Sequence, residues 1–235
     1  MFNLIVTKIK PIIPNFFFSF LRCFLTAILT PVFFSYKSGH FYSSILKKAV
    51  NSKFEPIPWY TYPAIDFLNN LNLESKKVLE FGSGQSTLWW SKKTKEVYAL
   101  EDNNFYFQKL RNKKINNIKI FKVETNLNNF NQINLATQSF DIIVVDGLDR
   151  YKCFQISLNL IKNDGIIVFD NSEGYHEKVD ARGSFPILKL MNENNYKRVD
   201  FYGYAPGVIK KHCTSIFFKT DSFIEKLNLN IERFN

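Results

Sequence analysis

Residues 78–87 read VLEFGSGQST, and this stretch decides the fold. An apolar run leads into Glu80, and Gly82 and Gly84 follow at once. A second apolar run, VYAL, ends at Glu101. Glycines after a buried strand let the backbone turn tightly and approach a ligand, and a carboxylate one strand over can hold a ribose diol. The stretch therefore predicts a nucleotide-type pocket in an α/β domain.

Strand-like and helix-like segments alternate on both sides of this stretch. Predicted strands cover 77–81, 97–100, 118–123, 140–145, 165–169, 197–203 and 214–219. Predicted helices cover 63–71, 86–93, 103–113, 151–161, 184–194 and 221–229. Runs such as IIVV and IIVF lack polar alternation, as expected in a parallel sheet covered on both faces. The pattern predicts a doubly wound, mostly parallel α/β sheet, with its last two strands joined as an antiparallel hairpin.

Four of the predicted strands end in a carboxylate. These carboxylates are Glu80, Glu101 with Asp102, Asp146, and Asp170 followed by Asn171. One such residue is better explained as a helix cap or a turn former. Because open α/β sheets bind ligands beyond the carboxyl ends of their strands, four at corresponding positions indicate a functional site at that edge.

These motifs resemble those of the class I S-adenosylmethionine-dependent methyltransferases, over about residues 75–220. EFGSGQS is similar to the glycine motif of that family, and FDIIVVDG and GIIVFDN are similar to its later strand motifs. The resemblance implies a seven-stranded sheet with S-adenosylmethionine over its first two strands. The implied cofactor contacts are Glu80, Gly82, Ser83, Gly84, Ser86, Glu101, Asp102, Glu124 and Asp146, with Thr125 as an alternative to Glu124 near the adenine.

A nicotinamide dinucleotide site is the competing interpretation of the same glycines. Its fingerprint needs a third glycine at position 87, for close helix–strand packing beside a pyrophosphate. The chain has Thr87 there, which favours a cofactor without a pyrophosphate.

The strand ends at Asp146, Asp170 and Asn171 also resemble the cation site of the catechol and caffeoyl-CoA O-methyltransferases. Three oxygen ligands of this kind suit Mg²⁺ and leave positions open for a substrate oxygen. The chain departs from that pattern, because Asp149 and Arg150 stand where those enzymes carry a lysine. The alternative is that Asp146 contacts cofactor or substrate directly while Asp170 and Asn171 cap a turn.

The resemblance implies an enzyme that transfers a methyl group to a hydroxyl acceptor, carried by a small molecule, a sugar or a lipid. Asp146, His176 and Arg150 are the residues expected to bind, deprotonate or orient that acceptor. Two alternatives stay open: an aminopropyl transferase of the spermidine synthase type, and a non-catalytic module that keeps only the fold.

The N-terminal segment differs from the rest of the chain. Residues 11–34 read PIIPNFFFSFLRCFLTAILTPVFF, long enough to cross a bilayer. Arg22 opposes a simple crossing, at a cost of about 2.5–3.5 kcal/mol, and Pro11, Pro14 and Pro31 are expected to bracket or interrupt the helix. A helix on the membrane surface, a helix packed on protein and a true span remain open. We divide the chain into an apolar segment at 1–36, a connecting region at 37–74 and a cofactor-binding domain at 75–235.

Charge and cysteine content restrict partners and location. The formal net charge is +10, but the basic residues are scattered rather than gathered in a stripe or arm, so we expect no nucleic-acid partner. The three cysteines lie far apart without a CxxC pair, which indicates a reducing compartment. We expect a cytoplasmic protein or one held at the cytoplasmic face of a membrane.

Overall fold

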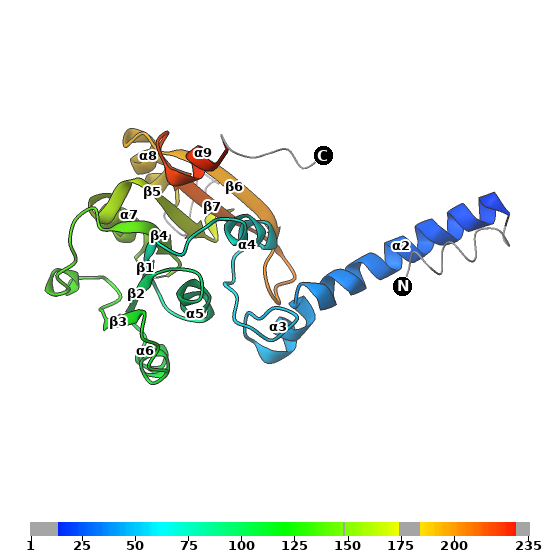
Figure 1. The fold of residues 1–235 in the computed structure, drawn as a ribbon, viewed down its shortest axis with the longest axis horizontal. Helices are drawn as coiled ribbons and strands as arrows, with labels where there is room; N and C mark the ends of the chain where they lie inside the picture. The colour runs from blue at the N-terminus through cyan, green and yellow to red at the C-terminus, as the bar shows by residue number, and fades with distance from the viewer. Residues whose placement is uncertain (1–13, 148, 174–183, 229–235) are drawn as a thin grey trace.

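The computed structural model describes residues 14–147, 149–173 and 184–228. Seven strands form one sheet in the order β3-β2-β1-β4-β5-β7-β6 (Figure 1). Their bounds are Lys77–Phe81 (β1), Glu96–Glu101 (β2), Ile118–Lys122 (β3), Phe140–Val145 (β4), Ile161–Asp170 (β5), Lys197–Tyr204 (β6) and Lys211–Phe218 (β7). Strands β1 to β5 pair in parallel, and β7 pairs antiparallel with both β5 and β6. The predicted fold class and the terminal hairpin are confirmed.

Helices cover both faces of the sheet and create two cores. Their bounds are Tyr62–Asn69 (α4), Gln85–Ser91 (α5), Asn104–Arg111 (α6), Arg150–Leu160 (α7), Ser184–Glu193 (α8) and Phe223–Asn228 (α9). The apolar residues of α4 and α5, including Trp89 and Trp90, pack with Val78 and Ile142 on one face. The residues of α7 and α8 pack with Leu79 and Ile143 on the other. Successive strand residues thus point into different cores, as a pleated strand buried on both sides requires.

The N-terminal part forms two helices, α2 (Asn15–Lys37) and α3 (His40–Leu46). Figure 1 shows α2 projecting away from the sheet, and none of its residues is buried. By length and composition, α2 is the one described helix that suits a membrane crossing. The helix begins directly after Pro14, as expected, but it continues through Pro31 to Lys37. The expected interruption at Pro31 is therefore wrong.

Helix α3 lies in the region expected to be only a connection, so it is a further difference from the sequence-based expectation. Gly39 precedes it with φ +80°, and a Cβ there would lie 2.3 Å from the carbonyl oxygen of Val50. Only glycine allows this close approach, which folds the 47–51 segment back against the start of α3. The Ser43 hydroxyl secures the fold-back, because it both accepts from Val50 N and donates to Val50 O.

Candidate functional site

The turn after β1 is shaped by two glycines with different roles. Gly82 has φ +117°, and a Cβ there would lie 3.0 Å from the carbonyl oxygen of Asp146. A side chain at this position would strain the backbone and press the β1 turn against the end of β4. Gly84 is extended, and a Cβ there would meet no atom within 4 Å. The space beside Gly84 is therefore open, as a ligand cradle requires.

Glu80 lies behind this turn. Its side chain is 1% exposed, and its two oxygens accept hydrogen bonds from the hydroxyls of Ser86 and Thr87, in the first turn of α5. Burial raises the pKa of Glu80 to about 8, although these two hydroxyls lower it. Because the Glu80 side chain is almost fully buried and is bonded to α5, the direct cofactor contact expected there is not seen and stays a prediction. Ser86 likewise points back to Glu80.

Glu101 ends β2 beside the glycine turn. Its Oε2 accepts a hydrogen bond from Ser83 Oγ at 2.5 Å, and its Oε1 accepts one from the backbone N–H of Asn103 at 2.8 Å. Each carboxylate oxygen has two lone pairs, so both keep acceptor capacity. The side chain is buried, and its two hydrogen bonds fix the carboxylate as an acceptor for a diol.

One cavity adjoins the glycine turn. It has a volume of about 210 Å³ and is lined by Ser83, Gly84, Ser86 and Asp146 together with Lys47, Lys48 and Trp59. A second cavity, of about 660 Å³, is lined by Asp102, Glu124, Thr125 and Asp149. Thr125 Oγ1 donates to Asp102 Oδ2 at 2.7 Å, which ties the end of β3 to the end of β2. Apart from Glu80, Gly82 and Glu101, the residues expected to contact the cofactor thus line these two cavities.

Two further carboxylates lie together at the ends of β4 and β5. Burial raises the pKa of Asp146 to about 6, and it raises the pKa of Asp170 well above its usual value, with the Asp146 charge adding to the effect. Arg150, at the start of α7, opposes both shifts. Thr214 Oγ1 donates to Asp170 Oδ1 at 2.8 Å. The pair therefore holds a proton near neutral pH, because two adjacent carboxylates, with Asp170 buried and Asp146 half-buried, do not both ionise readily.

Asn171 connects this pair to His212, which was not among the residues expected to bind the acceptor. Its Oδ1 accepts from Arg150 at 3.4 Å, and its amide nitrogen lies 3.4 Å from His212 Nδ1. The same Nδ1 lies 2.9 Å from Glu173 Oε1. His212 Nε2 is buried and has no hydrogen-bond partner among the described residues. A histidine held at one nitrogen by a carboxylate, with the other nitrogen unpaired, is a candidate base, although Nε2 is enclosed here and His212 lines neither cavity described above.

The residues expected at the acceptor and at a cation site have different outcomes. Asp146 and Arg150 come together with Asp170 and Asn171, as the strand-end argument predicts. His176, the remaining expected acceptor residue, lies outside the described residues. Within the described ranges, no three His, Cys, Asp or Glu side chains form a metal-binding cluster, so the Mg²⁺ site stays a prediction.

Comparison with known proteins finds similarity in the structure but not in the sequence. No protein-family model matches the sequence, and no curated protein matches it. A protein from Klebsiella pneumoniae assigned as an O-methyltransferase aligns with a TM-score of 0.52 and 16% identity, over 61% of this chain and 73% of the other. Fibrillarin from Aeropyrum pernix, with natively bound S-adenosyl-L-methionine, aligns with a TM-score of 0.51 and 12% identity, over 66% and 72%.

A third solved structure, spermidine synthase from Thermotoga maritima, aligns with a lower TM-score of 0.45 and 14% identity, over 61% of this chain and 52% of the other. Sequence identities this low are evidence for a shared fold alone. The strand order, the glycine turn after β1 and these similarities lead to one conclusion: the chain has the class I S-adenosylmethionine-dependent methyltransferase fold.

Proposed function

We propose that the protein transfers a methyl group from S-adenosylmethionine to a hydroxyl acceptor. The observation that carries the proposal is the buried Glu101 carboxylate, which accepts a hydrogen bond from the Ser83 hydroxyl. It lies beside a glycine turn that leaves open space at Gly84. A carboxylate at the end of the second strand suits a ribose diol. The open backbone at Gly84 suits the close approach of a ligand without a pyrophosphate.

The residues present fit the cofactor at three points. Glu101 would hold the ribose hydroxyls, Gly82 and Gly84 would line the methionine end, and Asp102 with Glu124 or Thr125 would lie towards the adenine. The cavity lined by Ser83 and Gly84 and the cavity lined by Asp102, Glu124 and Thr125 give room for these two ends of the cofactor. When bound, S-adenosylmethionine supplies an activated methyl group, so the protein has mainly to align the acceptor and exclude water.

His212 and Glu173 support the role of base at the acceptor end. In this proposal His212 Nε2 takes the proton of the acceptor hydroxyl as the methyl group is transferred, and Glu173 holds the ring through Nδ1. Although burial opposes it, hydrogen bonds from backbone N–H groups and from His212 lower the pKa of Glu173 below its usual value. A carboxylate that stays ionised favours the imidazolium formed in this step.

Arg150 supplies positive charge where the sequence predicted a cation. Its guanidinium donates to Asn171 Oδ1, one of the three expected ligands, and it interacts with both carboxylates of the Asp146–Asp170 pair. We therefore assign Asp146 and Arg150 to orienting the acceptor without a bound Mg²⁺. Donation from a guanidinium fixes the direction of an oxygen as a cation would, although more weakly.

Aminopropyl transfer is the alternative enzyme. Its polyamine acceptor needs an open acidic pocket, whereas Asp170 is 2% exposed and Arg150 lies beside the pair. Calorimetry in detergent micelles with S-adenosylmethionine and with its decarboxylated analogue separates the two. Tighter binding of S-adenosylmethionine supports methyl transfer, tighter binding of the analogue supports aminopropyl transfer, and binding of neither supports a non-catalytic module.

The proposal also includes the location of the protein in the cell. Helix α2 is apolar and unburied, which supports attachment to a membrane, and the scattered lysines that follow it suit the cytoplasmic face. A hydroxyl acceptor carried by a small molecule, a sugar or a lipid is compatible with this location.

A further inference from the structure

Helix α2 has the surface of a lipid-facing helix. Its large side chains are exposed in every turn, from Phe16 at 78% through Phe24 and Ile28 to Phe33. A helix that is apolar around most of its circumference is normally buried in a core or in a membrane. Within the described chain, only the last turns of this helix meet other elements, and none of its residues is buried. Its most polar face, which includes Arg22 and Thr26, carries a single charge. A helix that lies flat on the headgroups has a much more strongly charged face.

The dimensions of α2 fit a crossing. Its 23 residues extend over roughly 34 Å, and the hydrocarbon core of a bilayer is about 30 Å thick. Arg22 lies about 22 Å along the axis from Lys37, so its long side chain can reach the far headgroups. The Thr26 hydroxyl donates to Arg22 O at 2.8 Å and is thus satisfied inside the helix.

A second apolar and basic surface lies at the base of α2. We define the base surface as the exposed side chains of α3, of the segment after it and of the turn between β6 and β7, together with Lys37 at the end of α2 and Lys211 at the start of β7. Its apolar members are Phe41, Ile45, Leu46, Phe54 and Ile209, of which Ile209 is 88% exposed. Its basic members are Lys37, Lys47, Lys48, Lys53, Lys210 and Lys211. Apolar side chains ringed by lysines suit the boundary between acyl chains and anionic headgroups.

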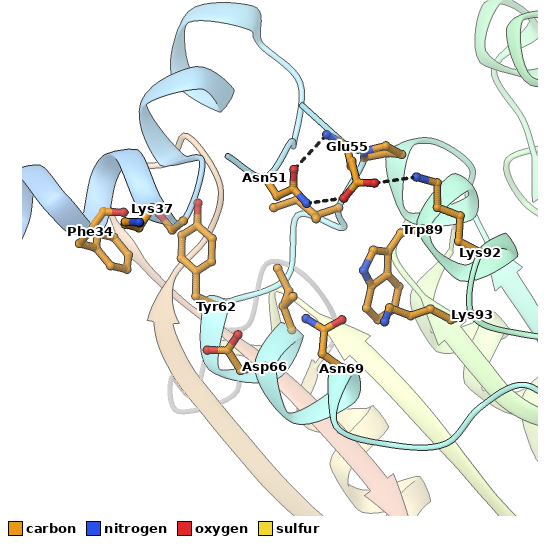
Figure 2. Close-up of a pocket in the computed structure, with 14 residues that line it drawn as sticks. Phe34, Lys37, Asn51, Glu55, Tyr62, Asp66, Asn69, Trp89, Lys92 and Lys93 are labelled. Atoms are coloured by element: carbon orange, nitrogen blue, oxygen red, sulfur yellow. Dashed lines mark hydrogen bonds and ion pairs between the residues drawn. The ribbon is translucent and has the colours of Figure 1, made fainter. Parts of the chain in front are cut away.

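Hydrogen bonds and ring contacts join these segments into one unit. Gly207 N donates to His40 Nδ1 at 3.3 Å, which fixes the β6–β7 turn to α3, and the Tyr42 and Phe54 rings lie 4.6 Å apart. Figure 1 shows this turn and α3 side by side next to the end of α2. The Phe34 ring packs edge-on against Tyr62 at 5.3 Å, so α2 is also tied to α4 (Figure 2).

A cavity of about 580 Å³ opens at the same level (Figure 2). The last turn of α2 forms one wall, and Trp89, Lys92 and Lys93 of the α5 region form another. Lys92 pairs with Glu55 at 3.4 Å, whereas Lys93 lies over the Trp89 ring. This arrangement adds two more lysines near the base of α2.

The base surface also borders the cofactor cleft. Lys47 and Lys48, which follow α3 directly, line the cavity beside Gly84, and so does Trp59. Trp59 Nε1 donates to Pro206 O at 2.8 Å and so connects the mouth of this cavity to the β6–β7 turn. A membrane against the base surface would therefore meet the mouth of the cleft.

We propose that α2 spans a bilayer, that the base surface rests on its anionic headgroups, and that the cleft opens there to an acceptor carried by a lipid. The acceptor part rests on the proposed methyl transfer, whereas the membrane contact does not.

Native side chains provide the probes for the spanning helix. Cys23 is the exposed cysteine, while Cys153 and Cys213 are buried. In liposomes that contain anionic lipid, the full chain should resist alkaline extraction, and a water-soluble maleimide should not label Cys23. A cysteine in place of exposed Lys95, at the opposite edge of the sheet, should label rapidly as the control. Equal labelling of both, or a chain that stays soluble as a monomer or a self-associated oligomer, overturns the proposal.

Trp59 reports on the base surface, since Trp89 and Trp90 are buried. Lipids brominated near the headgroup should quench its fluorescence, and Trp59→Phe should remove the quenched signal. Ile45→Asp with Ile209→Asp should reduce quenching at least twofold while α2 keeps the chain in the membrane. The matched charges Asn192→Asp, at an exposed position in the last turn of α8, and Asn195→Asp, in the turn before β6, should leave the quenching unchanged. Equal quenching in both double variants overturns the contact.

The acceptor is tested with S-adenosylmethionine labelled in its methyl group and membranes from the source cells. Label in the organic extract, reduced by the Ile45→Asp and Ile209→Asp pair, supports a lipid-borne acceptor. Label only in water-soluble product overturns this part and leaves the proposed function intact. Absence of S-adenosylmethionine binding by calorimetry overturns the proposed function and the acceptor with it, while the labelling and quenching results still decide the membrane contact.

Discussion

Ser83 Oγ donates a hydrogen bond to Glu101 Oε2 at 2.5 Å and so joins the glycine turn after β1 to the end of β2. Ser83 lines one cavity of the site, and Asp102, the residue after Glu101, lines the other. The hydrogen bond fixes a buried carboxylate at the position where the fold is expected to hold the ribose of a cofactor.

Replacing Glu101 should weaken cofactor binding. Glu101→Gln keeps the shape of the side chain but loses its charge, and loss of charge-assisted hydrogen bonds to two hydroxyls should raise the Kd for S-adenosylmethionine by about 10- to 100-fold. Calorimetry on the full chain in detergent measures this. Glu96→Gln, on the same strand at the opposite edge of the sheet, is the matched control and should bind as the parent does. Parent-like affinity in Glu101→Gln would argue against the assigned ribose contact.

Glu80 should make the protein less stable as the pH rises. Its pKa is about 8 when folded and near 4.5 in an unfolded chain, so between these values the folded form alone keeps the proton. Its contribution to stability is complete below about pH 4.5 and is lost as the pH rises through 8. Relative to Glu80→Gln, the free energy of unfolding of the parent should fall by a few kcal/mol over this range. Chemical denaturation at several pH values checks this, and parallel curves for the two proteins would contradict it.

His212 should act in the chemical step and not in cofactor binding. Loss of a general base costs typically 100-fold or more, so His212→Asn should lower kcat by about that factor while calorimetry shows unchanged S-adenosylmethionine affinity. Glu173→Gln should cause a smaller loss, because it removes the charge that orients the ring. Lys95→Gln, at the far edge of the sheet, should match the parent. An unchanged kcat in His212→Asn would remove this residue from the mechanism.

Chelation tests the role given to Arg150. If its guanidinium supplies the positive charge beside Asp146 and Asp170, a chelator should leave turnover unchanged, and Arg150→Gln should lower it by about 10-fold or more. Turnover that falls on chelation and returns with Mg²⁺ or Mn²⁺ would instead establish the cation that the sequence predicts.

The sequence was most informative where local chemistry and topology agree. Apolar runs that end in glycines or carboxylates located the strand ends, and parallel pairing then brought Asp146, Asp170 and Asn171 to one edge. The direction in which a side chain points was harder to predict from the sequence. Glu80 ends β1 as expected, but the hydroxyls of Ser86 and Thr87 turn it into the interior, because α5 begins directly over it.

The elements that depend on distant contacts were missed. Helix α3 exists because Gly39 lets the chain fold back onto Val50, a contact between two positions that no periodic pattern marks. His212 reaches the site because β7 runs antiparallel and starts at the edge where the other strands end. The expected terminal hairpin could have predicted the position of His212, since it places the first residues of its second strand at the carboxyl edge of the sheet. The pairing of His212 with Glu173 could be seen only in the folded chain.

Gly84→Val tests the central claim, cofactor binding at the glycine turn, most directly. Because Gly84 is extended and a Cβ there meets open space, valine should leave the fold intact and project into the proposed cofactor site. Gly82→Ala, by contrast, should destabilise the fold, since its φ is +117°. Calorimetry with S-adenosylmethionine should show binding to the parent and none to Gly84→Val at an unchanged melting temperature. Equal binding by the parent and Gly84→Val, or none by the parent, would contradict the account.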